Sequence, residues 1–354
     1  MKIFNIDFHI SGMLDLRAIF ENLGHSLKDV SLSGHNFVLD RKQGTVPMLD
    51  NDNWNGLIER KLWNSFHDAY HSQLDKYDCF LTFYPPIFSM LYKNFNKPII
   101  VVVPIRYEYG ADCNEKDWAV LNEYLQRDNV YLVANNLYDK HYTENWVDKT
   151  VEYIPSICDY TGMYYTGGND RHLYYSQQKE SSVSSKFLYK HDVLKGGHSW
   201  VDLCQFKTIT HFPYNCSTMS FFEHYAAGIP MFIPTLDYSM RLYEQEYKIW
   251  GQLGWPITCN RPAGSLLPGN NKYDPNDYLD SDAMRYWLRY SDFYNDVEFS
   301  NLNYFGSMEE LNEIVDIYDL EKISKLMQIQ NVIRKRRVYD KWENLLTSIE
   351  KGHR

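Results

Sequence analysis

The feature that most constrains the fold is an uninterrupted apolar run at residues 97–104, KPIIVVVP. Consecutive Ile and Val residues between two prolines are typical of a strand that is buried on both faces. Strand-like runs also occur at residues 77–84 (YDCFLTFY) and 129–134 (NVYLVA), and residues 117–126 have a helical pattern. Buried strands separated by helical segments predict a parallel sheet in an α/β domain.

The start of the chain shows the same alternation. Residues 2–10 are strand-like, residues 13–23 carry apolar side chains at helical spacing, and residues 26–32 are strand-like again. Gly24 stands where a helix-ending glycine belongs. Strand, helix and strand are predicted once more in the second half, at residues 209–213, 217–227 and 229–234.

The remaining segments connect or extend these units. Residues 159–185 are rich in Tyr, Gly, Ser and Gln without clear periodicity, so we expect a connector with a surface excursion. We expect a helix at 236–250, a long polar loop at 258–278, and an almost wholly helical tail at 308–350. A chain of 354 residues exceeds what one core usually serves, which favours two domains.

Charge and cysteine usage exclude several classes of protein. The formal net charge of −10 disfavours a nucleic-acid binder that relies on neutralising phosphates. The six cysteines are scattered without a C-x-x-C pair, which fits reduced thiols in the cytosol better than zinc or a disulfide framework. There is no signal-peptide pattern and no apolar run of membrane-spanning length, so we expect a soluble, cytoplasmic protein.

One basic run, Arg334-Lys335-Arg336-Arg337, stands out in the tail. Two interpretations are open for it. It can make a peripheral contact with anionic lipid, or it can form a solvated helix face.

The segment that carries most chemical information is residues 211–235, HFPYNCSTMSFFEHYAAGIPMFIPT. A helix N-terminus that follows a strand presents unpaired N–H groups and a partial positive charge, which suit a diphosphate. Ser217, Thr218 and Ser220 can add hydroxyl donors there, and Glu223 can accept hydrogen bonds from a ribose diol. In the alternative interpretation, Ser220 and Glu223 form a capping box and Glu223 only caps its own helix.

The stretch from Phe222 to Pro230, FEHYAAGIP, resembles the C-terminal domain of GT-B glycosyltransferases. In the retaining branch of that family, a glutamate at the position of Glu223 binds the donor ribose. A first glutamate normally precedes it in that branch, and Asn215 stands in its place here. Asn215 can still form a hydrogen bond with the donor sugar. Because the first glutamate is missing, the resemblance does not carry over the retaining mechanism.

The turn at residues 7–12, DFHISG, resembles the first strand–helix loop of the same family. There a glycine, here Gly12, lets the chain approach the donor phosphate. In some inverting members a histidine at this turn is the general base, a role that His9 can fill because its pKa ordinarily lies near neutrality. The alternative is that His9 only bonds to the backbone.

Two further sites are predicted beside these loops. Arg106 and Glu108 follow the 97–104 strand, and ligands of parallel sheets collect at carboxyl ends of strands. We expect Arg106 to bind phosphate or an acidic acceptor and Glu108 to bind acceptor hydroxyls, or both to form ion pairs within the fold. The family resemblance also implies a basic residue of the second domain that neutralises the donor diphosphate. We favour Lys190, after the apolar run at 187–189, over the other candidates Arg171, Lys186 and Lys195. The only D-x-D pattern that we weighed as a metal site, residues 50–52, lies in a polar loop.

The resemblance implies two Rossmann-like domains whose parallel sheets face each other across a cleft. It assigns residues 1–157 to an acceptor-binding domain and 158–325 to a nucleotide-sugar-binding domain. It makes residues 326–354 a last helix that crosses back to the first domain, with Trp342 as its packing anchor. The alternative is a surface helix that stays on the second domain.

The implied function is metal-independent transfer of a sugar from a nucleotide-sugar to a glycan or another hydroxyl acceptor. The donor is the substrate, UDP- or GDP-linked, and no cofactor is expected. The alternatives are a nucleotide-sugar epimerase and a catalytically degenerate scaffold that binds a glycan or a protein.

Overall fold

The computed structural model describes residues 1–36, 41–49, 56–111, 115–178, 183–194, 199–245, 272–277 and 279–352. Within these ranges the chain forms two compact units. The first contains Met1–Ser156 and the end of the chain from Val338 onward, and the second contains most of the chain from Ile157 to Arg337. Most of the polar loop predicted at residues 258–278 lies outside the described residues. The D-x-D letters at 50–52 lie outside them entirely.

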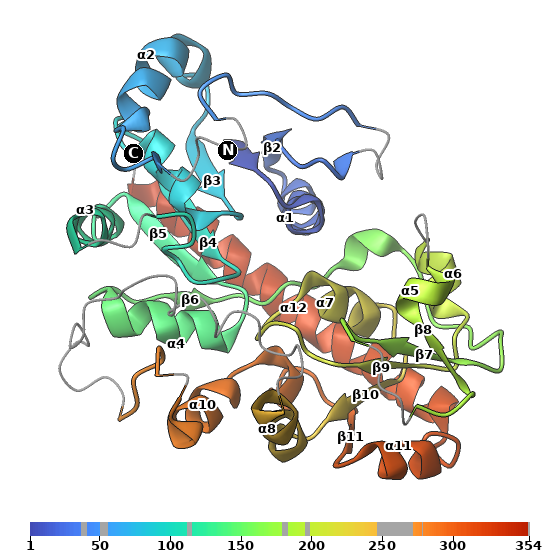
Figure 1. Ribbon diagram of the computed structural model, residues 1–354. Helices are drawn as coiled ribbons and strands as arrows, with labels where there is room; N and C mark the ends of the chain where they lie inside the picture. The colour runs from blue at the N-terminus through green and yellow to red at the C-terminus, as the bar shows by residue number, and fades with distance from the viewer. Residues whose placement is uncertain are drawn as a thin grey trace. The chain divides into compact units, whose positions relative to one another are not determined.

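The first unit is built on a six-stranded parallel sheet in the order β2-β1-β3-β4-β5-β6 (Figure 1). The run that opened the sequence analysis is β4, and all of its side chains are buried. The strands are β1 (Lys2–Asp7), β2 (Ser26–Ser31), β3 (Cys79–Thr82), β4 (Ile99–Val103), β5 (Val130–Ala134) and β6 (Glu152–Tyr153).

Helices connect these strands. The predicted helices at 13–23 and 117–126 are present with shifted ends, whereas α2 and α4 were not predicted. The helical segments are α1 (Ile10–Asn22), α2 (Leu62–Leu74), η3 (Pro86–Tyr92), α3 (Glu115–Leu125) and α4 (Leu137–Trp146). After β1 the chain adds β2 on one side and β3 on the other, so the strand order reverses at the carboxyl ends of β1 and β3.

The second unit has a five-stranded sheet in the order β11-β10-β9-β7-β8, again with parallel pairing throughout. One of its strands, β7, lies inside the segment 159–185, so our interpretation of that segment as an aperiodic connector was wrong. The strands are β7 (His172–Tyr175), β8 (Phe187–Tyr189), β9 (Thr208–His211), β10 (Met231–Pro234) and β11 (Asn303–Phe305).

Short helices accompany this sheet (Figure 1). The helix predicted at 217–227 is α7, and the helix predicted at 236–250 is described only as α8. The helical segments are η4 (Asp159–Thr161), α5 (Lys190–Val193), α6 (Trp200–Cys204), α7 (Met219–Ala226), α8 (Leu236–Glu244), α10 (Ser281–Leu288), η6 (Asp292–Tyr294) and α11 (Met308–Ile314). The strand order reverses at the carboxyl ends of β7 and β9.

The last helix, α12 (Leu320–Gly352), contributes to both units. Its later part packs on α1, where the Trp342 ring meets the Phe20 ring edge-on at 5.0 Å between centroids. Both side chains are buried, at 1% and 0% exposure. The predicted fold class is therefore confirmed: two parallel α/β sheets and a C-terminal helix that returns to the N-terminal unit.

None of the described helices is both long enough and apolar enough to cross a membrane.

Candidate functional site

In the second unit, polar side chains gather where the strand order reverses. Tyr175 is the last residue of β7 and His211 is the last residue of β9, and the two are paired directly across the sheet. In open parallel sheets, ligands bind in the crevice outside the carboxyl ends of strands at such a reversal. The reversal of strand order therefore predicts a ligand site at the carboxyl ends of β7 and β9.

Lys190 comes to this point from the next strand. It begins α5 directly after β8, is only 9% exposed, and places its Nζ 4.0 Å from the centroid of the Tyr175 ring. Burial lowers the pKa of Lys190 to about 8. The ammonium is therefore charged at neutral pH, held over an aromatic face and largely removed from water.

The helix that follows β9 starts beside the same residues. Thr218 is the N-cap of α7, and its Oγ1 accepts a hydrogen bond from the backbone N–H of Phe221 at 3.3 Å. The capping box between Ser220 and Glu223 is therefore ruled out, because the helix begins two residues before the start that the box requires. Ser217 and Thr218 are buried, and the Ser220 hydroxyl lies 3.3 Å from the Thr218 hydroxyl.

Glu223, in the second turn of α7, turns its side chain toward η4, where the Tyr160 hydroxyl donates a short hydrogen bond to Oε1. Ser220 lies near the hydroxyls of Tyr175 and Tyr214, so that α7 meets β7 and the turn after β9 at this point. Asn215 is half-buried in that turn. Of the predicted donor residues, Lys190, Ser220 and Glu223 thus share one neighbourhood around Tyr175.

Two buried histidines lie behind this cluster. The His211 ring is 5.0 Å from the Tyr175 ring and 5.7 Å from the His224 ring, between centroids. Burial, followed by the charges of His224 and Lys190, holds the pKa of His211 well below its usual value. His211 is therefore neutral at physiological pH, and Lys190 supplies the positive charge.

Four residues of this site were not predicted from the sequence: Tyr160, Tyr175, Tyr214 and His211. The sequence offered a weak signal for His211, which lies inside the strand predicted at 209–213, and for Tyr214, which directly follows it. Tyr175 could not be found because β7 was not predicted, and Tyr160 meets Glu223 across 63 residues of sequence.

In the first unit, the loop after β1 occupies the corresponding reversal of strand order. Asp7 accepts a short hydrogen bond from the His9 backbone N–H and another, of 2.9 Å, from the Tyr84 N–H. Burial raises the pKa of Asp7 to about 7. This carboxyl group ties the loop after β1 to the loop after β3.

His9 is the N-cap of α1, and its Nδ1 accepts a hydrogen bond from the Gly12 N–H at 3.4 Å. Burial, together with the charge of His35, lowers the pKa of His9 to about 4. The premise that this pKa lies near neutrality was therefore wrong. Because Nδ1 is an acceptor, the neutral ring carries its proton on Nε2. This geometry fits the alternative in which His9 bonds to the backbone, and the general-base role stays a prediction.

Gly12 lies in the first turn of α1 against the ring of Phe83. A Cβ atom at this position would stand 2.2 Å from Cε1 of Phe83, closer than real contacts allow. Phe83 is itself 2% exposed and has little room to move. Packing alone therefore requires a glycine here, and its approach to a donor phosphate stays a prediction.

We expect Gly12→Ala to lower the free energy of unfolding by about 1–3 kcal/mol, the usual cost of overpacking a core. Urea unfolding of the variant measures this loss. The double variant Gly12→Ala/Phe83→Leu, which removes the ring atoms at the clash, should be less destabilised than the sum of its single changes. An additive result would show that the ring contact is not the reason for the glycine.

Arg106 and Glu108 follow β4 as predicted, but both are buried beneath α4. Arg106 donates to the Tyr138 hydroxyl at 3.2 Å and stacks on Tyr142, whose hydroxyl donates to Glu108 Oε1 at 2.9 Å. Burial raises the pKa of Glu108 to about 8, opposed by the charge of Arg106. These contacts with tyrosines of α4 are hydrogen bonds and a cation–π contact, not ion pairs. The ion-pair alternative and the roles toward an acceptor both stay predictions.

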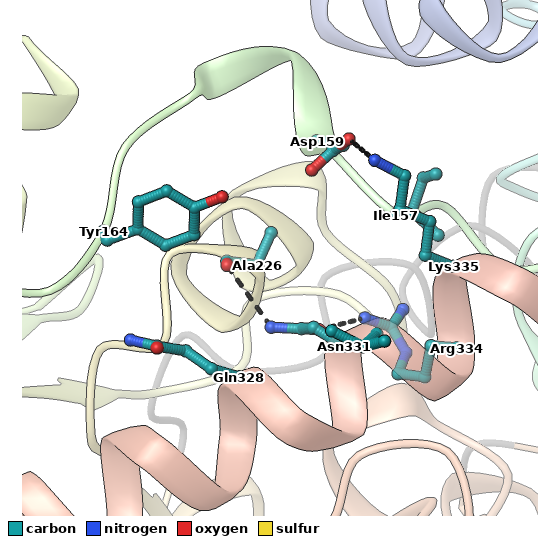
Figure 2. A pocket seen from close by; sticks show the side chains of 9 residues that line it. Ile157, Asp159, Tyr164, Ala226, Gln328, Asn331, Arg334 and Lys335 are labelled. Carbon is teal, nitrogen blue, oxygen red and sulfur yellow. Dashed lines mark hydrogen bonds and ion pairs between the residues drawn. The ribbon is translucent and has the colours of Figure 1, made fainter. Parts of the chain in front are cut away.

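A pocket of about 390 Å³ lies elsewhere in the second unit, between the end of α7, the η4 loop and α12 (Figure 2). It is at the opposite end of α7 from Thr218 and contains none of the predicted site residues. Among the described residues, no group of three or more His, Cys, Asp or Glu side chains is placed to hold a metal ion.

Comparisons with known proteins give a likeness in structure only. No protein-family model and no curated protein matches the sequence. The crystal structure of HepE from Anabaena in complex with UDP and glucose matches with a TM-score of 0.53 at 11% identity, over 98% of this chain and 100% of that one. The chain has the GT-B fold.

Two other solved structures also align over nearly their whole length, at lower scores. The kitacinnamycin glycotransferase has a TM-score of 0.46 at 10% identity, covering 98% of each chain. MurG from Acinetobacter baumannii has a TM-score of 0.45 at 8% identity, covering 98% of this chain and 99% of that one. Assignment of the GT-B fold rests on the two parallel sheets and on the HepE comparison.

Proposed function

We propose that this protein transfers a sugar from a nucleotide-diphosphate-sugar to a hydroxyl acceptor, such as a glycan. The observation that carries the proposal is the cluster of Lys190, Tyr175, Ser220 and Glu223 at the strand reversal of the second sheet. The HepE structure, which shares the fold, was solved with UDP and glucose. We propose that the donor is UDP- or GDP-linked and that the reaction needs neither a metal nor a cofactor.

The chemistry follows from where charge develops. In the transfer, the bond between the anomeric carbon and the diphosphate oxygen breaks, and the diphosphate keeps the electron pair. The acceptor oxygen forms the new bond and gives up its proton to a base. We place the diphosphate at the N-terminus of α7, where the positive end of the helix dipole and the Lys190 ammonium stabilise its growing negative charge. Glu223, oriented by Tyr160, binds the donor ribose.

We expect a nucleoside diphosphate to stabilise the wild-type protein in a thermal-shift titration, and Lys190→Ala to weaken that binding about 10–100-fold. The ammonium of Lys190 is lost as pH rises through its pKa of about 8, so affinity should fall above that pH. UDP, GDP, ADP and CMP are the probes. Glu223→Ala should also weaken binding if the carboxylate holds the ribose.

Lys186→Ala is the matched control. Lys186 lies just before the first residue of β8, whereas Lys190 follows its last residue, and Lys186 pairs with Asp316. It should bind the nucleotide like the wild type. If no nucleotide stabilises the wild type, or if Lys190→Ala binds unchanged, the donor site is wrong. Once a nucleotide is identified, turnover of its sugar without an acceptor would instead indicate an epimerase, and binding without turnover would indicate a scaffold.

A further inference from the structure

The half of α12 that belongs to the second unit exposes apolar side chains to solvent. Leu326, Ile329, Val332 and Ile333, hereafter the α12 stripe, are 39%, 59%, 71% and 50% exposed. Their spacing of three and four residues places them along one side of the helix. A helix packed on a domain normally turns such a stripe inward. Here the inward positions are taken by other residues, including Met327 and Arg334.

Positive charge is concentrated in the same half of the helix. Residues 320–337 contain six Lys or Arg and one Glu, a net charge of +5 in a chain whose total is −10. Residues 338–352 contain two Lys and three Asp or Glu. Apolar exposure and positive charge therefore coincide on one half of α12 and are absent together from the other half.

Ion pairs cancel only part of this charge. Lys335 pairs with Asp159, and Arg334 and Arg337 share the carboxylate of Glu298. The exposed side chains of Lys322, Lys325 and Arg336 remain beside the stripe, with Glu321 at 3.8 Å from Lys325 as the one carboxylate paired with them among the described residues. The basic run of the sequence analysis is thus split, with Arg334 buried and the following three residues exposed.

An exposed aromatic side chain lies near the helix. Val332 also lines the pocket of Figure 2, and Tyr164 lines the same pocket from the loop after η4 with 62% of its surface exposed. Figure 2 shows Tyr164 on that loop, above Gln328 of α12. A tyrosine combines an apolar ring with a polar hydroxyl, which suits a boundary between water and an apolar phase.

We propose that this face of α12 docks on a lipid bilayer with anionic headgroups. A helix that lies in the plane of the interface buries an apolar side and attracts anionic lipid through nearby Lys and Arg, and both features are present here. A second copy of the chain is a poorer partner, because a symmetric dimer would place the same +5 segment against itself. The surface is separate from the proposed donor site and does not depend on it.

Co-sedimentation with vesicles tests the proposal. We expect the wild type to bind vesicles of phosphatidylcholine mixed with phosphatidylglycerol, to bind phosphatidylcholine alone much less, and to be released by salt. Ile329→Ser/Ile333→Ser should weaken binding to the mixed vesicles about tenfold or more. Lys322→Gln/Lys325→Gln/Arg336→Gln should do the same by removing charge.

The matched control is Val201→Ser/Leu279→Ser, which removes exposed apolar side chains from other parts of the second unit. It should bind like the wild type, and circular dichroism should show all variants folded. The proposal is overturned if the wild type does not bind the mixed vesicles or binds both kinds of vesicle equally. It is also overturned if Ile329→Ser/Ile333→Ser binds the mixed vesicles as tightly as the wild type. It is also overturned if the wild type is a dimer that the stripe variant dissociates, with no vesicle binding.

Discussion

Replacing Trp342 with alanine is expected to lower the free energy of unfolding by about 3–5 kcal/mol, the usual cost of removing a large buried aromatic side chain. The indole ring is 1% exposed and packs edge-on against Phe20 of α1. Its loss leaves a cavity between α12 and α1 that neighbouring elements cannot fully close. Differential scanning calorimetry and urea unfolding measure the effect, analysed for separate transitions because the chain has two units.

Two controls separate the packing effect from the helix itself. Trp342→Phe keeps an aromatic ring against Phe20 and should cost clearly less than the alanine substitution. Glu343→Ala changes the neighbouring exposed residue and should stay within about 0.5 kcal/mol of the wild type. A loss below about 1 kcal/mol for Trp342→Ala would mean that this contact does not anchor the helix.

Much of the fold could be predicted because its central strands carry a strong local signal. The apolar run of β4 and the strand–helix–strand pattern around α7 are visible in the residues themselves. The prediction that Trp342 packs against the first unit came from the family resemblance, and the contact with Phe20 agrees with it.

The missed strand β7 shows where such local reasoning fails. Its four residues, HLYY, stand between polar stretches and begin with a histidine. The His172 ring is nevertheless buried, because its Nδ1 is hydrogen-bonded to Thr208 and its Nε2 faces Asp316. Partners 36 and 144 residues away supply these bonds, so the sequence around His172 carried no sign of them.

The candidate site divides in the same way. The positions of Lys190, Arg106 and Glu108 at strand ends followed from the strand pattern, but the directions of their side chains did not. Tyr138 and Tyr142 of α4 hold Arg106 and Glu108 inside the first unit, and α4 was not predicted. The pKa of His9 is likewise lowered by burial, and the rings beside it belong to Phe83 and Tyr84, which are distant in the sequence.

The buried ion pair between Arg334 and Glu298 gives the second large effect that we expect on the free energy of unfolding. Arg334 is 1% exposed, its Nε lies 2.9 Å from Glu298 Oε1, and its guanidinium sits 4.4 Å from the centroid of Phe299. We expect Arg334→Met to cost about 3–5 kcal/mol, because it leaves the buried Glu298 carboxylate with Arg337 alone. Methionine keeps the aromatic contacts of the stem, so the loss reports mainly on charge.

A double-mutant cycle tests whether the unpaired Glu298 carboxylate causes the loss of stability. An unpaired charge and a loss of packing predict different stabilities for the double variant. Arg334→Met/Glu298→Gln removes both charges and should be more stable than Arg334→Met alone. Arg337 pairs with the other oxygen of the same carboxylate, and its side chain is 43% exposed. Arg337→Gln should therefore lower the free energy of unfolding by less than about 1 kcal/mol. If the double variant is no more stable than the single one, the unpaired carboxylate is not the source of the loss. Arg334 would then hold α12 by packing on Tyr225 and Phe299 rather than by its charge.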